Sequence, residues 1–183
     1  MLASPVNIYE YLLNNSEYAL YQGSSSGSIN SFMGLRGNDV DLASALIAMY
    51  RSRGIHSRYV VGTVSLSSDK VMNWLGVKNA DLAAGIMKDQ GIQKVTLSTD
   101  KTTIDFEHVW VEALLSYGSY RGAGPDSATT CAASSATCRW ISLDPSFKLK
   151  QYNAQSIDIY DNISFDYTSY YNAIKTTDNI EQG

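Results

Sequence analysis

The chain has 183 residues, of which 44% are hydrophobic, so it can bury a core rather than stay disordered. Its formal net charge is −4 and its basic residues are scattered, which excludes the basic surface that nucleic-acid binding needs. No apolar run approaches the roughly 20 residues that span a bilayer, and the first residues lack the charged and apolar regions of a signal peptide. We therefore expect a single domain over residues 1–183, belonging to a larger parent chain.

The first predicted element is an amphipathic helix with Ser4 as its cap and Pro5 in its first turn. Residues 23–29 are rich in glycine and serine, which predicts a flexible loop. A second helix is predicted over residues 41–53, because its apolar residues follow a helical stripe that Gly54 ends.

The middle of the chain alternates between strand and helix patterns. Residues 57–67 are β-branched and alternating, which predicts a strand. An insertion of about residues 69–105 follows, which we expect to overhang the site as a lid. Within the insertion, helices are predicted over 71–77 and 80–88 and a short strand over 94–98; further strands are predicted near 107–115 and 140–147.

Cys131 and Cys138 are the only cysteines, and they flank small residues in a loop insertion of about 116–139. We interpret them as a disulfide that closes this loop. Because a disulfide needs an oxidising compartment, we expect a secreted, periplasmic or cell-surface protein. An alternative in which Cys138 lies beside a histidine as a nucleophile stays open, and thiol alkylation tests it.

After Pro145 the chain becomes tyrosine-rich and only weakly periodic. We expect a core of about residues 5–150 and a C-terminal extension of about 151–183, frayed from residue 176 onward. The two histidines and the acidic residues lack the spacing of metal ligands, so no metal or cofactor is expected.

Three separated segments carry the chemistry. The first, Gly-Asn-Asp-Val-Asp-Leu-Ala-Ser at residues 37–44, opens the second helix. The second, Glu-His-Val-Trp-Val-Glu at 107–112, lies on a predicted strand, and the third, Trp-Ile-Ser-Leu-Asp-Pro at 140–145, lies on another. Arriving in this order, the three are far more specific than any one alone.

These segments resemble those of the transglutaminase-like family, whose core is similar to papain. The resemblance implies an α+β fold, with N-terminal helices packed on an antiparallel sheet and a helical insertion before the histidine strand. Family members carry a nucleophilic cysteine, a histidine and an aspartate at the three segments. By position, His108 and Asp144 match the last two, while the cysteine position falls on Asp39. The chain is similar to cysteine-less domains found in bacterial surface proteins, including large YD-repeat proteins.

Asp39 has two interpretations. It can cap the helix, as Asp and Asn often do, a role that Asn38 could also take. It can instead face His108, giving a carboxylate, imidazole, carboxylate arrangement that would raise the pKa of the histidine. Asp41 would lie in the first helical turn, where its negative charge interacts favourably with the helix dipole. The predicted strands bring His108 onto one face with Trp110 and Asp144 onto one face with Trp140, and we count both tryptophans, with Asn38 and Asp41, as candidate binding residues.

The sequence supports two hypotheses for the function. A carboxylate is a poor acyl-transfer nucleophile compared with a thiolate, so Asp39 argues against transglutamination. The first hypothesis is a non-catalytic module that binds a polypeptide within a larger secreted protein. The second is a cysteine-independent peptidase, amidase or acyltransferase that uses His108 and Asp144.

Overall fold

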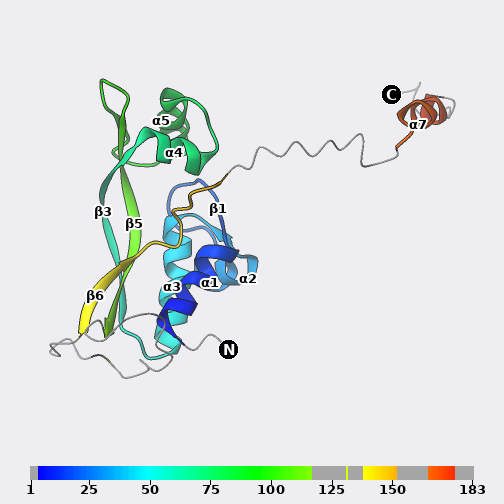
Figure 1. Cartoon of the computed structure of the whole chain (residues 1–183). Coiled ribbons are helices and arrows are strands. Elements are labelled where there is room, and N and C mark those ends of the chain that lie inside the picture. Colours follow the sequence, from blue (N-terminus) through cyan, green and yellow to red (C-terminus); the bar gives the residue numbers. More distant parts are fainter. Residues whose placement is uncertain (1–3, 117–130, 132–137, 152–164, 176–183) are drawn as a thin grey trace. The chain divides into compact units, whose positions relative to one another are not determined.

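The computed structural model describes residues 4–116, 131, 138–151 and 165–175 (Figure 1). The chain forms two compact units, Met1–Lys150 and Gln151–Gly183, each of which is described by itself. The helices of the first unit are α1 (Pro5–Asn15), α2 (Gly27–Gly34), α3 (Asp39–Ser52), α4 (Ser68–Leu75) and α5 (Ala80–Asp89). The second unit contains α7 (Tyr167–Lys175), whose described aromatic side chains are exposed.

The main sheet is antiparallel and centres on one long strand, β5. Strand β5 pairs with β3 and β4, and β6 pairs with its C-terminal half. A separate two-stranded parallel sheet joins β1 to β2. This confirms the expected α+β architecture of helices packed on an antiparallel sheet. The bounds are β1 (Glu17–Tyr18), β2 (Arg36–Gly37), β3 (Ser57–Ser67), β4 (Thr96–Leu97), β5 (Thr103–Ser116) and β6 (Cys138–Leu143).

Local signals account for some of the helix ends. The Ser4 hydroxyl accepts the Asn7 N–H at 3.1 Å and caps α1, with Pro5 in its first turn. Helix α4 ends at Gly76, whose φ of 74° is the left-handed conformation that glycine adopts without a steric penalty. The predicted extension of this helix to residue 77 is therefore wrong.

The predicted flexible loop over residues 23–29 is wrong in its second half, because α2 begins at Gly27. The segment before that helix is held by hydrogen bonds to Asp41 on α3, a long-range contact that local composition does not reveal. Helix α7 also has no counterpart among the predicted elements. The predicted loop insertion at 116–139 lies outside the described residues except at its ends and at Cys131.

Strand β5 serves two hydrophobic cores. Val111 and Ala113 pack against α1 and α3, whereas Ile104 and Phe106 pack against α4 and α5. Before His108 the buried side chains of β5 belong to even-numbered residues, and from Val111 they are mainly those of odd-numbered residues. The pairing of β5 with β3 nevertheless continues without a break. Because the helices of this unit lie on the same side of the sheet (Figure 1), twisting of the β3–β5 ribbon accounts for the change.

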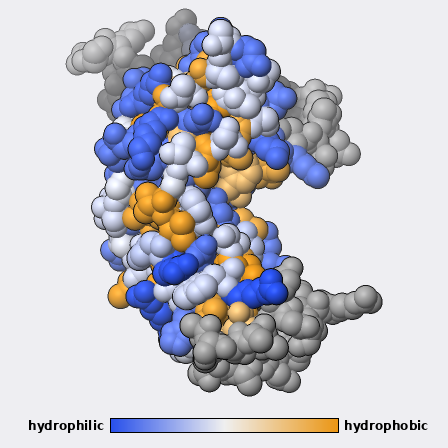
Figure 2. Space-filling model, turned by 90° about the vertical axis from the view of Figure 1, so that its left-hand side faces the viewer, coloured by the Kyte–Doolittle hydropathy of each residue, from blue (hydrophilic) through white to orange (hydrophobic). Residues whose placement is uncertain are grey.

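The opposite side of the unit is mainly hydrophilic, with small hydrophobic patches (Figure 2). On β3 the exposed large apolar side chains are Tyr59 and Val61. Arg58 pairs with Glu112 at 2.7 Å and its guanidinium lies 4.2 Å from the Trp140 ring centre. Trp140 therefore belongs to this polar and aromatic cluster on the sheet.

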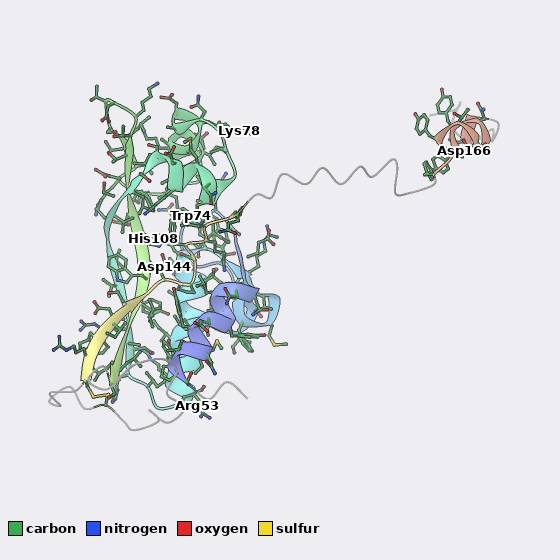
Figure 3. All side chains as sticks on the ribbon, in the orientation of Figure 1. Arg53, Trp74, Lys78, His108, Asp144 and Asp166 are labelled. Atoms are coloured by element: carbon green, nitrogen blue, oxygen red, sulfur yellow. A yellow bond between two sulfur atoms is a disulfide. The ribbon has the colours of Figure 1, made fainter. Side chains whose placement is uncertain are left out.

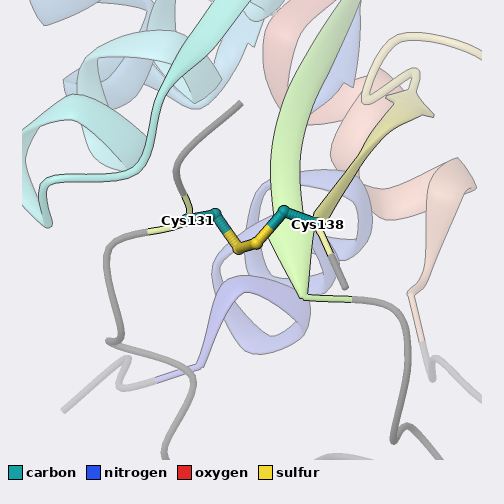
Figure 4. The surroundings of a disulfide bond; sticks show 2 residues. All are labelled: Cys131 and Cys138. Carbon is teal, nitrogen blue, oxygen red and sulfur yellow. A yellow bond between two sulfur atoms is a disulfide. The ribbon is translucent and has the colours of Figure 1, made fainter. Parts of the chain in front are cut away.

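Cys131 and Cys138 form a disulfide at the start of β6, with their Cα atoms 5.7 Å apart (Figure 4). Because the sequence contains no other cysteine, the chain has no free thiol. This overturns the alternative in which Cys138 acts as a nucleophile. A disulfide is compatible with an extracellular location.

Replacing both cysteines with serine is expected to lower the free energy of unfolding by about 2.5 kcal/mol, because a short loop is then no longer closed in the unfolded chain. Urea unfolding of the wild type and the double variant measures the difference. A reducing agent should lower the stability of the wild type by a similar amount and leave the double variant unchanged. Equal stability of the two proteins without reductant would contradict the prediction.

Candidate functional site

The N-terminus of α3 positions Asp39 while another residue caps the helix. The Asn38 side chain accepts the Asp41 N–H at 2.9 Å, and its amide nitrogen donates to the carbonyls of Tyr21 and Gly23. This leaves the Asp39 carboxylate for the sheet, where it accepts the Val109 N–H at 2.9 Å. Asn38 is therefore the residue that caps the helix. Asp39 follows the second interpretation, in which its carboxylate faces the histidine.

His108 lies on β5 where the two hydrophobic cores meet, and only 5% of its surface is exposed. Its Nδ1 atom is 3.3 Å from Asp39 Oδ2, and its Nε2 atom is 2.8 Å from Asp144 Oδ2. The side chains of Asp144 and His108 point towards each other between the sheet and the helices (Figure 3). The imidazole is therefore bracketed by two carboxylates.

Asp144 follows the last residue of β6, so the chain segment after the strand has to hold its side chain in place. The Ser146 hydroxyl and N–H donate to Asp144 Oδ1 at 2.6 and 2.9 Å. The Tyr9 hydroxyl donates to the Asp144 main-chain carbonyl at 3.1 Å, and the Trp74 indole donates to the Ser146 carbonyl at 3.1 Å. Contacts from α1 and α4 thus fix the carboxylate that faces His108.

The two carboxylates determine the charge of the histidine. Burial alone would lower the pKa of His108, but hydrogen bonds and charge from Asp144 and Asp39 outweigh it and raise the pKa to about 9. Burial alone would raise the pKa of Asp144, but the hydrogen bond and positive charge of His108 lower it overall. The raised pKa favours an imidazolium between the carboxylates at neutral pH, and a cationic ring cannot accept a proton from a nucleophile.

The aromatic side chains around His108 differ from the expected ones. Trp74 and Phe106 contact the imidazole edge-on, with ring centres 5.8 and 5.7 Å away. Trp110 instead lies across Gly62, where an added Cβ would come within 2.9 Å of the ring. Gly62 is the residue paired with His108 across β3 and β5. Among the described residues neither Trp110 nor Trp140 makes a ring contact with the imidazole, and their expected binding role stays a prediction.

Asp41 lies next to this site and is fully buried. Its carboxylate accepts hydrogen bonds from the hydroxyls of Tyr21 and Ser24, both at 2.6 Å. Three consecutive N–H groups, those of residues 25–27, also donate to it at 2.8 to 3.0 Å. Burial alone would raise the pKa of Asp41, but these hydrogen bonds outweigh it and hold the pKa well below its usual range.

Two serine hydroxyls near the site have hydrogen-bond partners of their own. The Ser146 hydroxyl is 3.4 Å from His108 Nε2, but it is fully buried and donates to Asp144. The Ser44 hydroxyl donates to the Val40 carbonyl one turn earlier in α3. Within the described ranges, no group of three or more His, Cys, Asp or Glu side chains is arranged to hold a metal ion.

A groove of about 710 Å³ lies beside the site. Tyr18 and Trp74 line it, and their ring centres are 4.4 Å apart. Because the Trp74 ring also contacts His108, the groove and the buried site share a wall. Other lining residues come from the α2 region, from the loop between β1 and α2, and from Lys150.

The structure brings together Asp39, His108 and Asp144, which sequence reasoning named as candidates. That reasoning did not name Ser146 and Trp74, which contact them. A signal for Ser146 was present, since a serine two residues after an aspartate commonly hydrogen-bonds back to it in a turn. Trp74 appeared only as one apolar residue of a predicted helix. Its contact with the histidine depends on how α4 packs on β5, which the sequence pattern does not state.

Comparison with known proteins gives one match. The family model described as Transglutaminase-like superfamily matches residues 2–145, which include all three segments of the site. Searches of curated proteins and of solved structures found no significant match. Among the helices that the structure describes, none is long and apolar enough to cross a bilayer.

Proposed function

The chain belongs to the transglutaminase-like superfamily, and on that premise we propose that it is a cysteine-less member that binds a polypeptide without catalysis, as a module of a larger secreted or cell-surface protein. The observation that carries this proposal is the arrangement of Asp39, His108 and Asp144. A carboxylate stands at the helix N-terminus that would stabilise a thiolate, and it pairs with the histidine instead of attacking a substrate.

The competing function is an amidase or peptidase that uses His108 with water or a serine. A general base must be neutral and must reach the proton that it removes. The raised pKa of His108 and its two carboxylate partners oppose the first condition, and its burial opposes the second. The Ser146 hydroxyl lies 3.4 Å from His108 Nε2, but its fully buried position keeps a substrate carbonyl away.

The test compares retention with turnover. A library of peptide amides is incubated with the full chain, and retained peptides and hydrolysis products are both quantified by mass spectrometry. We expect stable retention and no cleavage above buffer. Turnover that His108→Ala abolishes would overturn the proposal in favour of the amidase, and the absence of any retained peptide would also overturn it.

If Asp39 occupies a former thiol position, Asp39→Cys should produce an activated cysteine. The new thiol would stand at the N-terminus of α3 beside His108, and both features stabilise a thiolate. We expect its pKa to lie about 2 units below the usual value near 8.5, measured by the pH dependence of iodoacetamide alkylation. The native cysteines are bonded to each other, so the introduced cysteine would carry the only free thiol of the variant.

The matched control for this prediction is the double variant Asp39→Cys, His108→Gln. The helix N-terminus is retained there and the imidazolium is lost, so the thiol pKa should rise towards its ordinary value. An unshifted thiol in both variants would contradict the assignment of Asp39 to the nucleophile position. Circular dichroism checks that both variants keep the native secondary structure.

A further inference from the structure

The groove beside the buried site has a positively charged lining, which favours acidic ligands. Its only charged lining residues are Arg36 and Lys150, both exposed and both cationic, among the residues that the structure describes. Arg36 is only loosely paired with Glu17, at 4.0 Å between two exposed side chains, which contributes little. Lys150 forms no ion pair with any side chain in the described part of the chain. The groove therefore presents two positive charges without a strong internal partner.

The main chain of Lys150 is anchored beside the groove, and its exposed side chain starts from this fixed point. The Lys150 N–H donates to the Asn73 side chain at 2.7 Å, and the Asn73 amide donates to the Lys150 carbonyl at 2.8 Å. Asn73 belongs to α4, the helix that also carries Trp74. The cation and the aromatic wall thus come from one anchored region.

The groove lining also includes β1, which is an edge strand. The N–H groups of Glu17 and Ala19 donate towards β2, at 2.8 and 2.9 Å. Successive residues of a strand direct their main-chain groups to opposite edges, so those of Tyr18 face away from β2. Among the described residues this sheet contains only β1 and β2. Tyr18 also lines the groove, which places a strand edge without a neighbouring strand at its wall.

From these features we propose that the groove binds an extended acidic polypeptide segment, which pairs with β1 as an added strand and places its carboxylates at Arg36 and Lys150. Strand addition gives main-chain hydrogen bonds, while side-chain pockets give specificity. The packed rings of Tyr18 and Trp74 offer a surface for an apolar side chain of the same segment. This inference rests on the proposed polypeptide-binding function and names the class of polypeptide.

The experiment selects displayed random decapeptides on the immobilised full chain. Enriched peptides are then synthesised with a fluorescent label, and their Kd is measured by anisotropy for three proteins: the wild type, Arg36→Glu with Lys150→Glu, and a control with Arg53→Glu and Lys78→Glu. The control residues are exposed, lie outside the groove lining, and are at opposite ends of the unit in Figure 3.

We expect the enriched peptides to be rich in Asp and Glu. The groove variant should bind them at least about tenfold more weakly, and the control variant, which has the same net charge, should stay near the wild type. Affinity of the wild type should also fall with added salt. Only every second N–H group of an added strand faces the neighbouring strand. N-methylation of the odd-numbered peptide positions and N-methylation of the even-numbered ones are therefore two phases, and one should abolish binding while the other spares it.

The outcomes separate this inference from the proposed function. Enriched peptides without acidic residues, or equal Kd values in all three proteins, would overturn the acidic groove while leaving polypeptide binding intact. Loss of binding in both N-methyl phases, or in neither, would overturn strand pairing. Acidic peptides that bind at the groove and are cleaved would support the groove and overturn the non-catalytic function. If no peptide is enriched, both proposals fail.

Discussion

Asp41→Asn is expected to lower the free energy of unfolding by about 3 kcal/mol, because it replaces a buried, fully hydrogen-bonded carboxylate by a neutral amide. The carboxylate accepts five hydrogen bonds, three of them from consecutive main-chain N–H groups. Asparagine offers only one acceptor oxygen, and its NH₂ group would face the remaining donors. Urea unfolding at pH 7 measures the loss.

A matched control is Asp69→Asn, which also removes an acid from the first turn of a helix but at an exposed position. We expect the control to change stability by less than about 0.5 kcal/mol. A similarly small loss for Asp41→Asn would contradict the prediction. Loss of order should be greatest around residues 21–27, so faster amide hydrogen exchange of that segment provides an independent readout.

The pH dependence of this effect follows from the direction of the shift. The folded-state pKa of Asp41 is lowered, so its contribution is present above the unfolded value near 3.9 and is lost only as pH falls through the lower folded value. The stability difference between the wild type and Asp41→Asn should therefore persist from pH 7 to pH 5 and shrink in stronger acid. A difference that disappears above pH 5 would contradict the assignment.

Asp41 also shows why part of the fold was not predictable. Its position in the sequence indicated an acid in the first turn of a helix, which is a local statement. Its carboxylate accepts hydrogen bonds from the segment before α2 and from the first residue of α2. These donor groups lie 14 to 20 residues earlier in the chain. Glycine and serine in that segment looked flexible because their order depends on a carboxylate supplied from elsewhere.

The positions of His108 and Asp144 were predictable because the evidence for them is local and ordered. His108 lies on β5 and Asp144 directly follows β6, and the antiparallel pairing of the two strands places Leu143 opposite Val111, so that Asp144 comes close to His108. Alternation placed Trp110 on the strand face of His108, and its ring lies over Gly62, the residue paired with His108 on β3. Alternation could not predict the contact of Trp74 with His108, because that contact depends on how α4 packs on β5.

The burial of His108 between two carboxylates also connects folding with function. The proposed non-catalytic function depends on the same pair interactions, because carboxylates that favour a charged imidazole oppose its use as a general base. Trp74 contacts the imidazole and also lines the groove, so it connects the buried site with the groove. A ligand in the groove would therefore contact the aromatic wall of the site rather than the imidazole.

The charge of His108 is expected to make stability depend on pH between neutrality and about pH 9. Its folded-state pKa is raised to about 9, so its contribution is complete below the unfolded value near 6.5 and is lost as pH rises through the folded value. The stability advantage of the wild type over His108→Gln should therefore be largest near pH 6 and decrease by up to about 3 kcal/mol by pH 10. Urea unfolding over this range measures it.

Nitrogen NMR gives a direct measurement of the same charge. In a His56→Gln background His108 is the only histidine, and at pH 7 both of its ring nitrogens should have the chemical shifts of protonated nitrogens. Asp144→Asn removes one of the two carboxylates and should lower the pKa of His108. A neutral His108 ring at pH 7 in the wild type would contradict the prediction. It would also restore the condition that a general base requires, and the amidase would then become the stronger hypothesis for this site.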